Sequence, residues 1–415
     1  MKILMINKFY FVKGGSERYY FELTKILKEH GHQVIPFSMK HPLNFPTKYA
    51  QYFVDHVEFN YNSKWAKFKR LWRTAPRIIY SIQARKRLGN LIRKVRPDIA
   101  HLHMIDHQIS PSILHTLRAY RIPVILTAHQ SKIICPNYRL FNWYKKQICE
   151  KCLDHHYYHP IFERCHKNST FAGMLLAIET YFHKMMKIYE KNVDIIHVPS
   201  MFFRNKFREA NVIGPQIIQL YYTIQIDQYR PNYNNRDYFV YFGRLEEAKG
   251  LETLLMAMRK ISSCNLYIVG KGYYQEYLEK LISKFALKNV NILGAMYGDE
   301  LKRVISKAKF VVVPSECYDN SPLVIYEAYA LGKPVIGSNI GGIPELIDNK
   351  VTGLLFKPGD SEELASKIKY FLDNPDLTIA YGRNARKKAE REFSPEVHYY
   401  KIINIYKSLV KSYHE

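Results

Sequence analysis

Short apolar runs of strand length alternate along this chain with longer segments in which apolar residues recur at helical spacing. That alternation is typical of parallel sheets with helices on both faces. The runs that predict strands are Lys2–Ile6, His32–Ser38, Asp98–His103, Val124–Ala128, Asp194–Pro199, Phe239–Phe242, Asn265–Val269, Val290–Leu293, Phe310–Pro314 and Val335–Ser338. Helical spacing predicts helices at Tyr19–His30, Ser81–Val95 and Ser394–Tyr413. We therefore expect an α/β protein.

The strand and helix pattern restarts after residues 214–235, which lack a clear helical period. A chain of 415 residues is also too long for one ordinary domain. We therefore predict two doubly wound, Rossmann-like domains, at residues 1–213 and 214–390. Residues 391–415 would form a helix that packs back on the first domain, and a cysteine-rich insertion at about 132–168 would interrupt that domain.

The formal net charge of +25 predicts a polyanionic partner: nucleic acid, an anionic membrane face or a phosphorylated substrate. The segment Lys64–Arg96 has twelve Lys or Arg and no acid, and Trp65, Phe68 and Trp72 recur in it near helical spacing. This pattern favours an interfacial helix on anionic lipid. It is also typical of a solvated basic helix with core aromatics, or of a surface that grips a glycan or nucleic acid.

The first residues lack the apolar stretch of a secretory signal, and no segment approaches the roughly 18 apolar residues of a membrane span. We therefore expect a cytoplasmic protein, peripheral on the cytoplasmic face of the membrane.

Glycines and a serine follow the first predicted strand, at Gly14, Gly15 and Ser16. With Ser16 as the N-cap of the next helix, the free amides there would suit a phosphate. A simple chain turn explains the two glycines equally well.

The second half places charged residues where two predicted strands end. Arg244 and Lys249 follow one strand, and two cations there would complement a diphosphate. Asp319 follows another strand, and Glu327 lies on the helix beyond it. With Ser321 as N-cap and Pro322 as first helical residue, the amides of Leu323 and Val324 would suit phosphate oxygens. Taken singly, each of these residues is as typical of a solvated protein surface as of a ligand-binding site.

Taken together, these motifs resemble the GT-B glycosyltransferases of family 4, which are retaining nucleotide-sugar transferases. The resemblance rests on Gly14–Arg18, Phe242–Arg244 with Lys249, Val269–Gly272, the pair Asp319 and Glu327, and Gly341–Glu345. It implies two Rossmann-like domains facing a cleft. It also implies a UDP- or GDP-sugar donor, a glycan or lipid-linked glycan acceptor, retained configuration and no cofactor or metal for catalysis.

The resemblance also implies roles for individual residues. The catalytic residues would be His129, Arg244, Lys249 and Asp319. The donor-binding residues would be Gly15, Gly243, Arg244, Lys249, Gly270, Glu316, Asp319, Ser321, Leu323, Val324 and Glu327. The chain departs from the family pattern at Asp319, where Glu is usual and Glu316 could share the role, and at Gln130, where related members often have Asp.

Two other functions stay open. A nucleic-acid-binding protein would explain the charge, although no recognised nucleic-acid motif appears and we expect no nucleic-acid partner. A non-catalytic, sugar-binding homologue is disfavoured by the joint presence of Arg244, Lys249 and Glu327.

Four cysteines, Cys135, Cys149, Cys152 and Cys165, have the spacing C-x13-C-x2-C-x12-C. A Cys-x2-Cys pair with two flanking cysteines is typical of structural zinc sites. Reduced thiols packed in a loop would explain them too, and disulfides are disfavoured in a reducing compartment. We predict a structural zinc.

Overall fold

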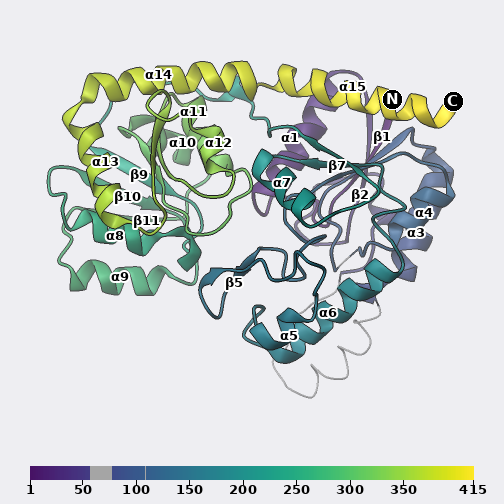
Figure 1. Ribbon diagram of the computed structural model, residues 1–415. Coiled ribbons are helices and arrows are strands. Elements are labelled where there is room, and N and C mark those ends of the chain that lie inside the picture. Colours follow the sequence, from purple (N-terminus) through teal and green to yellow (C-terminus); the bar gives the residue numbers. More distant parts are fainter. Residues whose placement is uncertain (57–76, 108) are drawn as a thin grey trace. The chain divides into compact units, whose positions relative to one another are not determined.

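The computed structural model describes residues 1–56, 77–107 and 109–415, and it divides into two compact units. The first unit comprises Met1–Leu220 and Tyr399–Glu415, and the second comprises Tyr221–His398. Each unit contains a six-stranded, all-parallel sheet, so the expected α/β class is confirmed (Figure 1). The first unit runs past the boundary expected at 213 and 214, because the strand that follows this boundary pairs within the first sheet.

The sheet of the first unit has the strand order β2-β1-β3-β4-β7-β8. These strands are β1 (Lys2–Ile6), β2 (Gln33–Phe37), β3 (Ile99–Leu102), β4 (Val124–Thr127), β7 (Ile195–Val198) and β8 (Gln216–Gln219). The central strands are buried along their whole length, as expected for a parallel sheet covered on both faces. The helices that connect them are α1 (Gly15–Glu29), α3 (Ile82–Val95), α4 (Ile113–Ala119) and α7 (Met201–Glu209), with a 3₁₀ turn at Ala50–Tyr52.

An insertion separates β4 from β7 in the first unit. It contains the antiparallel hairpin β5 (Phe141–Asn142) and β6 (Gln147–Ile148), followed by the packed helices α5 (His159–Glu163) and α6 (Thr170–Met185). The four cysteines lie in its first part. Helix α6 was not expected from the sequence.

The sheet of the second unit has the order β11-β10-β9-β12-β13-β14. Its strands are β9 (Tyr238–Phe242), β10 (Asn265–Val269), β11 (Val290–Gly294), β12 (Val311–Val313), β13 (Val335–Ser338) and β14 (Gly353–Phe356). The helices are α8 (Leu251–Met258), α9 (Gln275–Lys284), α10 (Gly298–Lys307), α11 (Leu323–Ala330), α12 (Ile343–Leu346), α13 (Ser361–Asp373) and α14 (Pro375–Glu392), with 3₁₀ turns at Ile226–Gln228 and Glu247–Lys249. Helices α8 and α13 pack together, as do α11 and α14 (Figure 1).

Each sheet has one point at which the order of its strands reverses. In the first sheet the reversal lies between β1 and β3, and in the second it lies between β9 and β12. Loops that leave neighbouring strands in opposite directions open a crevice at such a point, and ligands of open α/β sheets bind there. The predicted site residues follow these strands, so the topology itself indicates where to look for a site.

The last helix, α15 (Pro395–His414), runs from the second unit into the first. In the first unit, the Tyr406 hydroxyl lies 2.5 Å from Nδ1 of the buried His101, and the Tyr413 hydroxyl donates to Asp194 Oδ1 at 2.8 Å. Within the described residues, no helix has both the length and the apolar character that crossing a membrane requires. The aromatic part of Lys64–Arg96 lies outside the described residues.

Candidate active site

An ion pair lies at the switch point of the second sheet, between the loops that follow β9 and β12. Lys249 ends a 3₁₀ turn, and its Nζ donates to Asp319 Oδ1 at 2.5 Å. The Ser315 hydroxyl donates to the other oxygen, Oδ2, also at 2.5 Å. Only 16% of the Lys249 side chain and 17% of the Asp319 side chain are exposed. The fold thus brings together two residues that the sequence separates by seventy positions.

Both members of this pair are charged at neutral pH. Burial lowers the pKa of the Lys249 ammonium, but the Asp319 carboxylate outweighs this effect, and the pKa lies above its ordinary value. Burial likewise raises the pKa of Asp319, but Lys249 and the Ser315 hydroxyl outweigh it, and the pKa lies below its ordinary value. Because Lys249 uses one N–H for Asp319, it keeps further donors for a ligand.

Arg244 lies in the loop after β9 and is held more loosely. Its side chain is 54% exposed, and Nη1 donates to Glu246 Oε1 at 2.6 Å. The exposed guanidinium has further N–H donors with which it could bind a phosphate. The site thus combines a largely buried cation with an exposed one.

Glycines let the loops of the second unit come close to one another. Gly250 has φ 66°, and a Cβ there would lie 1.8 Å from the carbonyl oxygen of Pro314. Gly341 has φ 61°, and a Cβ there would lie 2.6 Å from the Asp319 carbonyl oxygen, which accepts a hydrogen bond from the Gly342 amide at 2.8 Å. The glycine pair after β13 thus supports the loop that holds Asp319.

Two further glycines of the predicted set lie at the ends of neighbouring strands. The Gly243 amide donates to the Val269 carbonyl at 3.0 Å, and Gly270 follows Val269 directly. These two glycines therefore border the same switch-point edge as Arg244.

Helix α11 begins at Leu323, with Pro322 in the N-cap position and no side-chain cap. The prediction that Ser321 caps this helix is wrong, because its hydroxyl lies 2.6 Å from the Tyr326 hydroxyl and bonds to it instead. The amides of Leu323 and Val324 still belong to the first turn, where they have no partner inside the helix. They remain suited to phosphate oxygens.

The two remaining acids of the predicted set lie in different surroundings. Glu327, on α11, is 5% exposed and accepts a hydrogen bond from the Tyr229 hydroxyl at 3.5 Å. Glu316 accepts from the Thr253 hydroxyl at 2.5 Å, and burial raises its pKa. Glu316 is thus hydrogen-bonded to a residue of α8, whereas Asp319 is paired with Lys249. The two acids therefore cannot exchange roles at this site.

In the first unit, α1 begins at Gly15, with Gly14 in the N-cap position. The expectation that Ser16 caps this helix is therefore wrong, since Ser16 lies within the first turn. The next turn packs on the neighbouring strand ends, and the ring centroid of Tyr19 lies 5.7 Å from that of His129.

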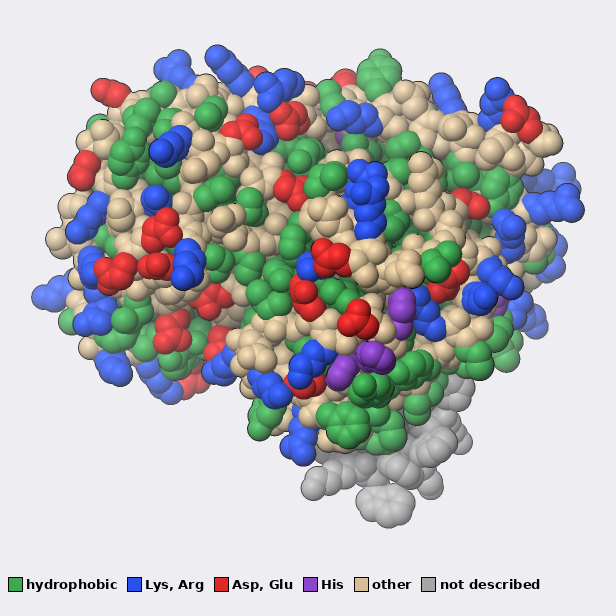
Figure 2. Space-filling view, viewed as in Figure 1, with side chains coloured by type: hydrophobic (Ala, Val, Ile, Leu, Met, Phe, Trp, Pro, Cys, Tyr) green, Lys and Arg blue, Asp and Glu red, His purple; other side chains and the backbone are tan. Residues whose placement is uncertain are grey.

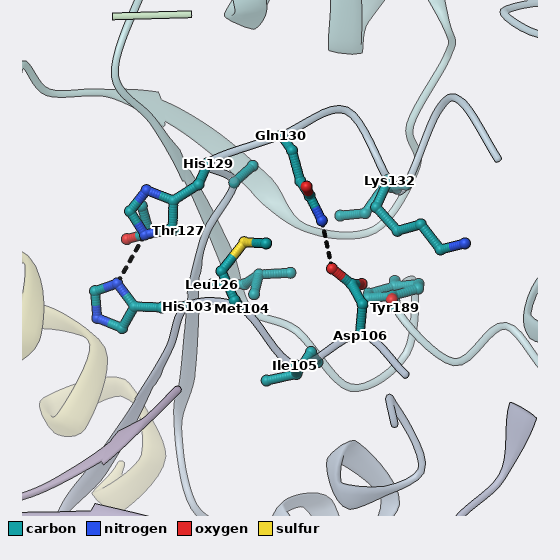
Figure 3. Close-up of a pocket in the computed structure, with 12 residues that line it drawn as sticks. His103, Met104, Ile105, Asp106, Leu126, Thr127, His129, Gln130, Lys132 and Tyr189 are labelled. Atoms are coloured by element: carbon teal, nitrogen blue, oxygen red, sulfur yellow. Dashed lines mark hydrogen bonds between the residues drawn. The ribbon is translucent and has the colours of Figure 1, made fainter. Parts of the chain in front are cut away.

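His129 follows β4 and pairs with a histidine from the end of β3 (Figure 3). His103 Nδ1 and His129 Nε2 lie 3.0 Å apart, and His103 Nε2 is buried with no hydrogen-bond partner among the described residues. Burial, assisted by the nearby His197, lowers the pKa of His129 to about 3. His129 is therefore neutral near pH 7, and it can exchange hydrogen bonds but cannot supply positive charge.

A small pocket beside His129 contains polar groups that we did not expect from the sequence. Gln130 Nε2 donates to Asp106 Oδ2 at 2.5 Å (Figure 3). Lys132, which also lines the pocket, forms a buried pair with Glu179 at 2.7 Å. Asp106 follows β3 by a few residues, and that placement is the signal that could have identified it. The pocket thus contains a carboxylate although position 130 is Gln.

The four cysteines are all free thiols in the insertion. They lie near one another: burial and the neighbouring Cys135 thiol both raise the pKa of Cys165, which reaches about 12. Across residues 1–56, 77–107 and 109–415, however, no three His, Cys, Asp or Glu side chains are arranged to hold one metal ion. The structural zinc stays a prediction from spacing, and metal analysis of protein purified without chelator would test it.

Comparison with protein families gives two adjoining matches. Residues 13–223 match the family described as "Glycosyltransferase Family 4", and residues 224–388 match "Glycosyl transferases group 1". The sulfoquinovosyl transferase SQD2 of Arabidopsis thaliana is 26% identical over 316 residues, which are 75% of this chain and 57% of that protein. A GDP-mannose-dependent phosphatidylinositol monomannoside mannosyltransferase of Corynebacterium glutamicum is 29% identical over 175 residues, 40% of this chain and 45% of that protein. The chain thus spans about half the length of these relatives.

Solved structures match almost the whole chain. The sucrose-phosphate synthase of Thermosynechococcus elongatus has a TM-score of 0.74 at 22% identity, covering 99% of both chains. Anabaena HepE in complex with UDP-glucose has a TM-score of 0.68 at 16% identity, covering 98% of this chain and all of its own. At these identities the likeness establishes the fold, which is the expected GT-B architecture.

Proposed function

The chain belongs to glycosyltransferase family 4, and from this membership we propose that it transfers a sugar from a nucleotide-sugar donor to an acceptor hydroxyl. The observation that supports this most directly is the second unit's switch point. There, the largely buried Lys249–Asp319 pair, the looser Arg244 and the first turn of α11 border one edge of the sheet. Cations and free amides at one edge suit a diphosphate.

We expect the donor to be a UDP- or GDP-sugar. HepE was solved with UDP and with UDP-glucose, and the name of the Corynebacterium relative specifies GDP-mannose. The buried carboxylate of Glu327 is suited to accept hydrogen bonds from ribose hydroxyls. The binding experiment described below identifies the nucleotide base of the donor, and the hydrolysis assays identify its sugar.

The chemistry we propose is stabilisation of the departing diphosphate. Negative charge grows on the phosphate as the bond to the sugar breaks, and Lys249, Arg244 and the α11 amides would meet it. Removing one such group typically lowers the rate by about 10²–10³. The neutral His129 would form a hydrogen bond with the transferred sugar. Asp319 would hold Lys249 in place and would also contact the sugar. Following the family pattern, we propose retention of configuration without a catalytic metal.

The acceptor we propose is a hydroxyl of a glycan or lipid-linked glycan, in the synthesis of cell-surface polysaccharide or glycolipid. The support is the net charge of +25 and the Corynebacterium relative, whose name specifies a phosphatidylinositol monomannoside. An acceptor embedded in lipid would place the enzyme at the cytoplasmic face of a membrane.

Thermal unfolding with UDP, GDP and ADP tests the donor site, followed by hydrolysis assays with the matching nucleotide sugars. We expect one nucleotide to raise the unfolding temperature, because a ligand at a hundred times its Kd stabilises the folded state by about 2.7 kcal/mol. Glu327→Gln should weaken this shift. Glu390→Gln, at an exposed position of the same unit, should leave it unchanged. No shift with any nucleotide, together with tight oligonucleotide binding, would replace the proposal by a nucleic-acid-binding function.

A further inference from the structure

Helix α6 exposes apolar side chains along one face. Phe171, Met174, Ile178, Tyr181 and Met185 are between 41% and 73% exposed. Their spacing of three and four residues places them on one side of the helix. In the space-filling view, hydrophobic side chains gather over the region of α5 and α6, low on this face of the first unit (Figure 2).

The opposite face of α6 is buried within the first unit. Leu176 and Ala177 are at most 5% exposed, and the one acid of the helix, Glu179, is 1% exposed. At Gly173 the helix lies so close to α5 that a Cβ would be 2.2 Å from the Pro160 carbonyl oxygen. A helix that is apolar all round is normally covered on all sides. Here the described residues cover one side of the helix and leave the other exposed.

The short helix α5 adds further exposed apolar side chains to those of α6. Phe162 is 76% exposed, and the neighbouring Tyr158 is 41% exposed. Isolated surface hydrophobics are common, but a contiguous group of this kind marks an interaction site. We call Phe162 and the five residues of α6 the apolar face.

The exposed charged residues that flank the apolar face in the sequence are cations. Between His159 and Lys191, every exposed charged residue is a cation: Arg164 and Lys167 precede α6, and Lys187 and Lys191 follow it. The two acids of this range besides Glu179 are mostly buried and paired, Glu190 with Lys184 at 2.9 Å and Glu163 with Lys145 at 2.7 Å. Apolar and aromatic side chains bordered by Lys and Arg are the pattern of a helix that lies in the interface of an anionic bilayer.

We propose that the apolar face is the surface with which this protein docks on an anionic lipid bilayer. A second copy of the chain is disfavoured as the occupant, because two such faces would bring like charges together in a protein of net charge +25. The inference rests on the membrane association proposed above but not on the transfer reaction. It adds α5 and α6 to the lipid contact that the sequence suggests at Lys64–Arg96, whose aromatic part lies outside the described residues.

The experiment is co-sedimentation of the full chain with phosphatidylcholine vesicles, with and without phosphatidylglycerol. We expect binding to the anionic vesicles, and we expect both Ile178→Glu and Ile178→Lys to weaken it by about tenfold, because either change places a charge in the apolar face. Ile213, 66% exposed in a loop of the same unit, provides the matched controls I213E and I213K. These change the net charge identically and should leave binding within about twofold of wild type.

Three results would overturn the proposal. Wild-type protein that does not bind anionic vesicles is the first. The second is binding that follows net charge alone, so that I178K binds as tightly as I213K. The third is a dimer in sedimentation velocity that I178E converts to a monomer. Nucleotide-sugar hydrolysis by I178E should equal that of wild type, so a failure of docking is separable from a failure of the proposed reaction.

Discussion

At the scale of single residues, Lys249 gains both its position and its charge from Asp319. The two side chains are more than four-fifths buried, and the pair fixes the ammonium group at the switch point. Removing one member of a buried pair leaves an uncompensated charge, which costs more than replacing both members by apolar groups. Stability and catalysis therefore respond differently to single and double substitutions.

We predict that Lys249→Met lowers the free energy of unfolding of the second unit by about 3–5 kcal/mol, because Asp319 is left buried without its partner. The double variant K249M/D319L should recover most of this stability. Both variants should transfer sugar about 10²–10³ times more slowly than wild type. Urea unfolding followed by circular dichroism and nucleotide-sugar turnover measure the two effects.

Lys260→Met is the control for this prediction, because Lys260 and Glu362 form an exposed ion pair in the same unit, with 48% and 69% of their side chains exposed. Its loss should change stability by about 1 kcal/mol or less. A double variant with wild-type turnover would show that Lys249 has a structural role only.

Some residue-scale features could not be predicted from the sequence. Ser16 and Ser321 both precede helical periodicity and both look like caps, but neither is one. Ser321 bonds to Tyr326, a residue of the helix it was expected to cap. A hydroxyl chooses among partners that are brought close only by the folded chain, so the local pattern does not determine the choice.

At the scale of elements, the sequence analysis missed four strands: the short hairpin strands β5 and β6, and the strands β8 and β14, which each lie at one edge of a six-stranded sheet. β5 and β6 have only two residues each, and β8 has Gln at both ends and no fully buried residue, so the apolar pattern of these three strands is weak. Helix α6 was missed for the opposite reason, since both of its faces are apolar and it therefore lacks a clear helical period. The central strands, which are buried on both faces, were all predicted.

The loop packing at the switch point predicts an unequal response to two glycine substitutions. Gly250→Ala should lower the stability of the second unit by about 3 kcal/mol or more, because a Cβ at φ 66° would meet the Pro314 carbonyl at 1.8 Å. Gly359→Ala, at φ 77° with no atom within 4 Å, should cost only the backbone strain of about 1–2 kcal/mol. Equal losses in urea unfolding would show that the clash at Gly250 is relieved by a loop movement.

At the scale of the whole molecule, the histidines are divided very unequally. Of the 17 histidines in the sequence, only His398 lies in the second unit. Several in the first unit are buried and neutral, and burial lowers the pKa of His129 to about 3 and that of His197 to about 4. A depressed folded-state pKa means that the unfolded chain binds protons first. The stability these groups confer is complete above about pH 6.5 and is lost as the pH falls toward their folded pKa values.

We therefore predict that acidification from pH 7.5 to 5 destabilises the first unit more than the second, in which burial lowers the pKa of Lys333 to about 7. Between pH 7.5 and 5, His197 alone accounts for a loss of about 2 kcal/mol, because its folded pKa of about 4 lies below this range. All three tryptophans lie within residues 1–220, so tryptophan fluorescence reports on the first unit, whereas circular dichroism reports on both. Urea midpoints from the two signals should separate as the pH falls. Midpoints that move together would contradict the prediction.

The order in which the two units can fold follows from the path of the chain. Residues 399–415 complete the first unit, yet they are synthesised after all of the second. Domains usually fold in the order in which they leave the ribosome, at about 5–20 residues per second. Here the nascent first unit lacks the helix whose Tyr406 bonds to His101 until the whole second unit has been synthesised. The second unit is therefore the first of the two that can be completed on the ribosome, and the first unit waits for residues 399–415.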